Sequence, residues 1–133
     1  MKYKIHITDK INELFYSLDE NKIDLHNDYR CIKIELINFE LHFSFKKIIE
    51  AEYKIISNVD SLSIIFIDVS EIDASQEITS TLHNNLIVNL DLGRFLENGN
   101  YVDSREGSYY FSVAFDDGLS ISFEAKEMYF DLF

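Results

Sequence analysis

Apolar and polar residues alternate along most of this chain, and a period of two is typical of β-strands with one buried and one exposed face. The clearest alternating runs, and the strands they predict, cover residues 32–36, 39–45, 62–67, 86–92, 109–115 and 119–125. Nearly every position of 62–67 is apolar, which indicates a central strand. The turns between these runs are too short for many crossover helices, so we expect the strands to pair antiparallel.

The strongest local signal is the Asp-Gly pair at 117–118, which separates the last two of these runs. Glycine accepts the positive φ of a tight turn, so Asp-Gly between alternating runs predicts a β-hairpin. After Ala125 the apolar residues of 128–132 fall in the other phase. Either a bulge redirects the strand there or a new element begins.

Only one segment has the period of a helix. Ile11, Leu14, Phe15 and Leu18 follow a possible cap at Thr8-Asp9 and form one apolar stripe. The stripe is two turns long and must pack on something larger. The sequence therefore predicts a mainly β (α+β) fold, an antiparallel sheet curled into a sandwich or partial barrel, with this N-terminal amphipathic helix packed on it.

Two segments are less regular. Ser75–Leu82 fits either a helix or a hairpin leading into the next strand, and we favour the hairpin. Gly93–Gly107 contains three of the four glycines and is expected to be the longest loop. Loops carried by rigid sheets often bind partners, so this segment is a candidate for function.

The composition is that of one folded domain covering residues 1–133. Hydrophobic residues make up 47% of the chain, proline is absent and only four glycines occur, so no linker divides it. We find neither a signal-peptide pattern nor an apolar run near the ~18 residues that a membrane helix needs. Cys31 is the single cysteine, which suits a reducing compartment, and we expect a cytoplasmic protein.

The charge is distributed unevenly. The net charge is −12, of which residues 1–54 contribute −1 and residues 55–133 contribute −11. A field of one sign attracts an oppositely charged partner and raises its association rate. It repels nucleic acid and phospholipid head groups, so we expect a basic protein partner, with no direct nucleic acid and no membrane.

Catalytic and metal-binding patterns are missing, and we expect neither enzymatic activity nor a cofactor. Glu40, His42 and Ser44 share a strand face, but that face lies opposite a run of apolar residues and is the solvated side of a sheet. The carboxylates within 68–73 do not have the spacing of a calcium loop. Cys31 has no local partner that would activate its thiol.

The remaining candidates form a partner-binding surface. Acidic residues steer association, whereas tyrosines are large and stiff enough to anchor an interface. The candidates are Asp60, Asp68, Glu71, Asp73, Glu77, Asp91, Glu97, Tyr101, Asp103, Glu106, Tyr110, Asp116 and Asp117.

A small, acidic, single-domain chain without catalytic groups resembles the immunity proteins of bacterial toxin–immunity systems, including contact-dependent growth inhibition. The run Phe115–Lys126, with its Asp-Gly turn, is similar to the closing hairpin of several such β-rich families. The resemblance implies that the protein binds and neutralises a cognate toxin domain, often a basic nuclease, and acts as a monomer or weak dimer. It has no motif from which individual functional residues can be transferred.

Two alternatives share parts of this argument. One is a phage-type anti-defence or regulatory protein that mimics a polyanion and binds a DNA-binding protein. The other is a β module that binds a small ligand, which the absence of tryptophan disfavours because tryptophan is a common stacking platform.

Overall fold

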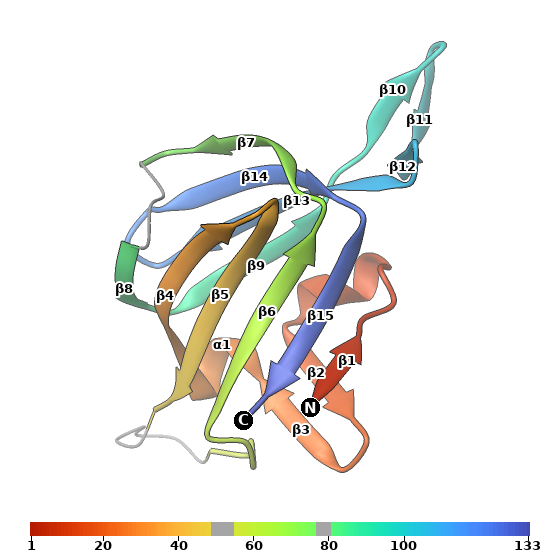
Figure 1. The fold of residues 1–133 in the computed structure, drawn as a ribbon. Helices are drawn as coiled ribbons and strands as arrows, with labels where there is room; N and C mark the ends of the chain where they lie inside the picture. Colours follow the sequence, from red (N-terminus) through yellow and green to blue (C-terminus); the bar gives the residue numbers. More distant parts are fainter. Residues whose placement is uncertain (49–54, 77–80) are drawn as a thin grey trace.

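The computed structural model describes residues 1–48, 55–76 and 81–133, and it places two antiparallel sheets face to face (Figure 1). The six-stranded first sheet has the order β1 (Lys2–Lys4), β15 (Glu127–Leu132), β6 (Ser61–Ile67), β5 (Glu40–Lys47), β4 (Tyr29–Ile37) and β8 (Thr81–Asn85). The five-stranded second sheet has the order β12 (Ser104–Arg105), β13 (Ser108–Phe115), β14 (Ser120–Ala125) and β7 (Ser70–Ala74), with β9 (Ile87–Leu92) also paired to β13.

The core between the sheets is aromatic. Alternation along β6 points Phe66 inward, and its ring centroid lies 4.8 Å from that of Phe111 and 4.7 Å from that of Phe123 on the second sheet. Phe43 of β5 contacts Phe66 edge-on at 5.8 Å. Because residues that face the core alternate with residues on the outer face of each strand, the pattern that predicted the strands also builds this core.

Two pairs of strands pass from one sheet to the other at the same corner. β6 continues into β7 through Asp68 and Val69, and β14 continues into β15 through Lys126 alone. The Lys126 N–H donates to the Ile67 carbonyl at 2.9 Å, which ties the two crossings together. A new strand therefore begins after Ala125, and this explains the change of apolar phase in the sequence.

The predicted helix over Ile11–Leu18 is wrong. A 3₁₀ helix η1 (Asp9–Glu13) ends at Leu14, whose φ of 57° is left-handed, and β2 (Phe15–Leu18) follows as a strand paired with β3 (Asn21–Asp24). A short helix α1 (Leu25–Asp28) completes this N-terminal unit. The i, i+3, i+4 stripe was only two turns long, and hairpin pairing together with burial of Tyr16 overrides so weak a signal.

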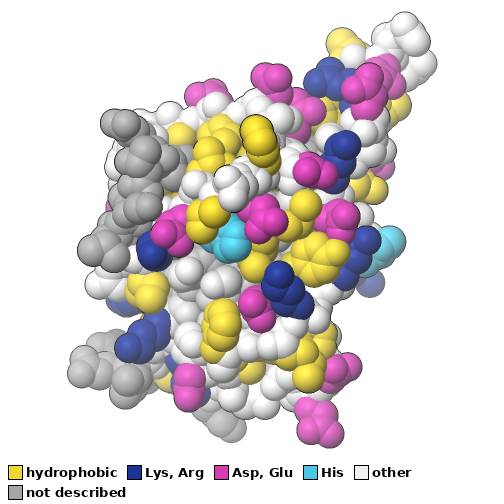
Figure 2. Space-filling view, viewed as in Figure 1, with side chains coloured by type: hydrophobic (Ala, Val, Ile, Leu, Met, Phe, Trp, Pro, Cys, Tyr) yellow, Lys and Arg dark blue, Asp and Glu magenta, His cyan; other side chains and the backbone are white. Residues whose placement is uncertain are grey.

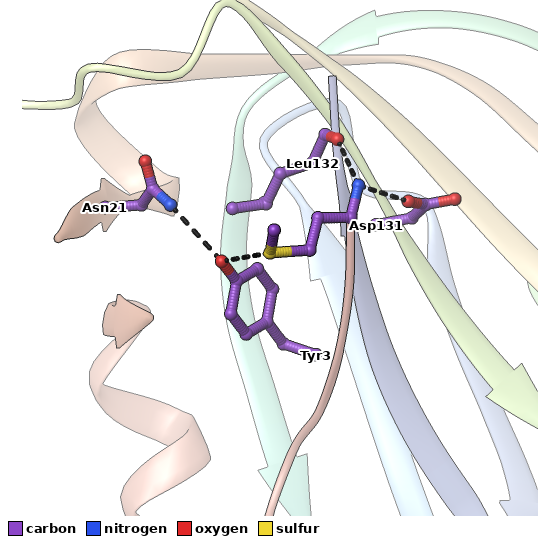
Figure 3. A network of polar contacts seen from close by, with 5 residues as sticks. Tyr3, Asn21, Asp131 and Leu132 are labelled. Atoms are coloured by element: carbon purple, nitrogen blue, oxygen red, sulfur yellow. Dashed lines mark hydrogen bonds and ion pairs between the residues drawn. The ribbon is translucent and has the colours of Figure 1, made fainter. Parts of the chain in front are cut away.

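Figure 3 shows how the start of the chain is fixed beside the last strand. The Met1 amino group donates to the Leu132 carbonyl at 2.9 Å and approaches Asp131 Oδ1 at 3.3 Å. Tyr3 Oη lies 2.8 Å from the Met1 sulfur and accepts a 3.5 Å hydrogen bond from the Asn21 side chain. These contacts join β1, β15 and the β2–β3 hairpin.

Most of the predicted strands are confirmed, including the central position of β6 and the β13–β14 hairpin. The predicted long loop at Gly93–Gly107 is wrong, because this segment forms β10 (Phe95–Glu97), β11 (Asn100–Val102) and β12. Of the ambiguous Ser75–Leu82, residues 77–80 lie outside the described part, and Thr81–Leu82 belongs to β8, which pairs with β4. No helix in the described ranges is long and apolar enough to cross a membrane.

Asp28, which is fully buried, holds an irregular segment against α1. Its Oδ2 accepts the N–H groups of Ile56 at 3.1 Å and Ser57 at 2.8 Å, and its backbone carbonyl accepts from Ile48 at 2.8 Å. Buried N–H groups are costly to leave without an acceptor. Asp28 therefore replaces strand pairing for the residues that lead into β6.

We expect Asp28→Ala to lower the free energy of unfolding by about 2 kcal/mol, because the buried N–H of Ser57 and the partly buried N–H of Ile56 lose their acceptor. The exposed Asp91→Ala should change it by less than about 0.5 kcal/mol. Urea denaturation of both variants measures the difference, and equal midpoints would contradict this role of Asp28.

Candidate protein-binding surface

The structure brings most of the predicted partner-binding residues to one side of the sandwich. Asp68, Glu71, Asp73, Asp91, Glu97, Tyr101, Asp103, Glu106, Tyr110, Asp116 and Asp117 lie on the second sheet, on its turns and projecting strands, or at the corner leading into it. Asp60 lies apart, at the start of β6, where it pairs with Lys47 at 3.2 Å. Glu77 lies outside the described residues.

One row across the outer face of the second sheet consists of two serines with an aspartate at each end. Strand pairing aligns Asp73, Ser122, Ser112 and Asp91 in one row across β7, β14, β13 and β9. The Ser122 hydroxyl lies 3.5 Å from that of Ser112. At about 4.8 Å per strand, the backbones of these two exposed aspartates are separated by roughly 14 Å across the sheet.

The outer faces of the two sheets differ in charge. The described residues 68–76 and 84–125, which build the second sheet and its connections, contain ten Asp or Glu and two Arg. Both arginines have an acidic partner, at 3.4 Å for Arg94–Asp103 and 3.5 Å for Arg105–Glu124. This side of the molecule therefore has an excess of negative charge.

The outer face of the first sheet is mixed. Figure 2 shows this face, with acidic and basic side chains interspersed around a histidine and several hydrophobic groups. Lys33 pairs with Glu35 at 2.8 Å, and Lys4 pairs with Glu127 at 3.4 Å. A hydrogen bond from Tyr129 lowers the pKa of the Glu127 carboxyl, and the same bond raises the pKa of Tyr129.

An arm, defined as residues 94–107, projects from the second sheet between β9 and β13 (Figure 1). Its strands β10 and β11 pair around Asn98-Gly99, where φ values of 51° and 81° give the left-handed turn that Asn-Gly favours. A two-stranded hairpin alone is marginally stable in water, so the arm must be held at its base.

The inner face of the arm supplies that anchor. The buried Phe95 ring contacts the Tyr110 ring edge-on, with 6.2 Å between centroids. The Arg105 guanidinium lies 4.5 Å from the centroid of the Phe95 ring and also pairs with Glu124. Gly93 permits this packing, because a Cβ there would lie 2.6 Å from Tyr110 Cδ1. Tyr110 is therefore half-buried and supports the arm.

The outer face of the arm is apolar and exposed. Leu96 and Tyr101 are cross-strand partners with exposed fractions of 61% and 71%, above the Arg94–Asp103 ion pair. Tyr101 was predicted from the sequence, whereas Leu96 was not. The register of the hairpin, with Phe95 turned inward, would have identified Leu96 if these residues had been recognised as strands.

We expect Phe95→Ala to release the arm, because removal of a buried Phe side chain costs about 3 kcal/mol. Amide exchange in β10 and β11 should accelerate at least about tenfold, while exchange in β5 and β6 stays unchanged. Leu96→Ala, on the opposite face, is the matched control and should leave exchange near that of wild type. Equal exchange in the two variants would contradict this anchoring.

Several predicted acids have local structural contacts. Asp116 Oδ1 accepts the Leu86 N–H at 3.1 Å, and Asp117 Oδ1 accepts the Leu119 N–H at 2.9 Å. Asp68 and Glu71 adopt positive φ values of 55° and 53° at the corner and in β7. These residues shape the turns, and their side chains, which are exposed, still add to the negative field.

Other candidate chemistry does not converge on a reactive site. His42 Nε2 lies 3.0 Å from Glu40 Oε1. The Ser44 hydroxyl oxygen lies 3.4 Å from that of Ser63. Among the residues whose placement is described, no group of three or more His, Cys, Asp or Glu side chains could hold a metal ion.

Cys31 is fully buried in β4, and burial raises the pKa of its thiol to about 12. Only about one thiol in ten thousand would then be ionised at pH 8, since each pH unit below the pKa lowers the thiolate fraction tenfold. We expect no reaction with Ellman's reagent in the folded protein and rapid reaction in urea. Fast labelling without denaturant would show that the thiol is accessible.

No protein-family model matches this chain, and no curated protein or solved structure is significantly similar to it.

Proposed function

We propose that this protein is a non-enzymatic inhibitor that binds and neutralises a cognate protein toxin, a basic domain of the nuclease type. The observation that carries the proposal is the placement of the acidic excess on the second sheet, opposite a first sheet whose outer face is mixed. A basic nuclease attracts phosphates with its positive field, and an acidic surface competes for that field.

In this proposal the arm contributes affinity, whereas the acidic residues contribute the rate of association. Exposed ion pairs are screened by salt and add little affinity, whereas apolar and aromatic side chains that become buried form the energetic centre of an interface. Leu96 and Tyr101 project together from the acidic side of the molecule. In this proposal, the acids accelerate encounter and this pair is buried in the complex.

The first test is capture of the partner from lysate of the producing cells at ~50 mM and ~500 mM salt, which differ strongly in screening length. We expect one basic protein that stays bound at the higher salt and whose toxic activity falls to zero at stoichiometric amounts of inhibitor. Recovery of a DNA-binding protein that has no toxic activity would instead support polyanion mimicry. Recovery of only loosely held cationic proteins would contradict both.

With the purified partner, reversal of Asp68, Glu71 and Asp73 to Lys should slow association at least about tenfold at low salt. The salt dependence of the rate should also flatten, because fewer charges steer the encounter. Stopped-flow or surface-binding kinetics measures both effects.

The matched control reverses Glu13, Asp19 and Glu20, which are exposed on η1 and the β2–β3 hairpin. It changes the net charge equally, and it includes one residue with positive φ, Asp19, where the first triple includes two, Asp68 and Glu71. We expect a smaller loss of rate in this control, and equal loss in both would mean that net charge acts without a defined surface.

A further inference from the structure

Among the residues that the structure describes, three hairpins close with two residues in the left-handed conformation. Their φ values are 47° and 65° at Asn38-Phe39, 51° and 81° at Asn98-Gly99, and 53° and 78° at Glu106-Gly107. Glycine occupies the second position in two of them, as expected, because in the left-handed conformation a Cβ lies too close to the following carbonyl oxygen. Phe39 is the exception.

The Phe39 ring does little for the fold. It is 75% exposed, and its backbone carbonyl accepts the Val69 N–H at 2.7 Å, a bond that glycine could also make. A bulky residue at positive φ is strained, and such strain concentrates at functional sites. Phe39 therefore has a backbone conformation that is unfavourable for a residue with a bulky side chain.

A hollow lies beside this turn, between the end of the β4–β5 hairpin and β7. It is open, has a volume of about 590 Å³, and is lined by the apolar Leu36, Leu41 and Ile72 and by the polar Asp73, Ser75 and Gln76. Leu36 is 46% exposed and Ile72 is 38% exposed, although both are large hydrophobic residues. Figure 2 shows hydrophobic side chains gathered at the turn end of the β4–β5 hairpin, with acidic side chains on the side toward β7.

The acidic residues around the hollow favour a positively charged partner. Asp73 lines it, and the exposed Asp68 and Glu71 precede it at the corner to which the Phe39 turn is bonded. A second copy of this chain would bring the same acids against these and would be repelled. A partner with apolar side chains flanked by Lys or Arg matches both the walls and the rim.

We propose that Phe39 and the adjacent hollow are an anchor site that binds an apolar side chain flanked by Lys or Arg on a protein partner. This inference rests on the proposed function in taking the partner to be basic, but it concerns a site separate from the arm. The alternating pattern did not reveal this site, because it placed Phe39 as the first residue of a strand.

The test uses the folded protein and a phage-displayed library of random 12-residue peptides, selected on wild type and counter-selected on Phe39→Gly. We expect enriched peptides to carry an apolar residue flanked by Lys or Arg. A synthetic consensus peptide should bind wild type at least about tenfold more tightly than Phe39→Gly, the effect of losing one anchor residue. Phe39→Tyr, which keeps the ring, should bind within about threefold of wild type.

Thermal unfolding separates the loss of an anchor from damage to the fold. Phe39→Gly should unfold at or above the wild-type midpoint, by up to about 4 °C, because the strained conformation is relieved. A lower midpoint, peptides that bind both proteins equally, or Phe39-dependent peptides without Lys or Arg would each overturn the anchor site. Failure of the proposed function would appear separately, as the absence of a toxin in the capture experiment.

Discussion

The corner at which two strand pairs cross between the sheets sets the arrangement of everything else. β6 turns into β7 and β14 turns into β15, and the Lys126 N–H to Ile67 carbonyl bond joins the two crossings. Because the connection at Lys126 is a single residue, the angle between the sheets is fixed where they meet. The same corner receives the hydrogen bond from Val69 to the Phe39 carbonyl, so the β4–β5 turn is held beside β7.

This topology converts an asymmetry along the chain into one in space. The chain after the corner supplies the second sheet and its arm, and it contains almost all of the unbalanced acid. The first sheet draws β1, β4 and β5 from the half in which lysines and acids are balanced. Two faces of different electrostatic character therefore exist on a domain with a single core.

The sequence predicted the strands well because period-two alternation and burial on one face have the same cause. It failed at the N-terminus, where the stripe at Ile11–Leu18 was too short to outweigh pairing of β2 with β3. It also failed at Gly93–Gly107, where the glycines mark hairpin turns rather than a loop. Tyr110 shows a further limit, since its strand parity correctly placed it on the outer face, but only the structure shows that Phe95 covers it.

The arm leaves the second sheet after Gly93 and returns through β12, which pairs with β13, and β9 and β13 on either side of it are paired neighbours. The chain thus enters and exits at adjacent points of a ladder that is complete without it. A segment inserted in this way can change in length and sequence while the sandwich beneath keeps its packing. The sequence of the arm and the stability of the domain can consequently evolve at different rates, and these two strands are a natural place to graft a foreign hairpin.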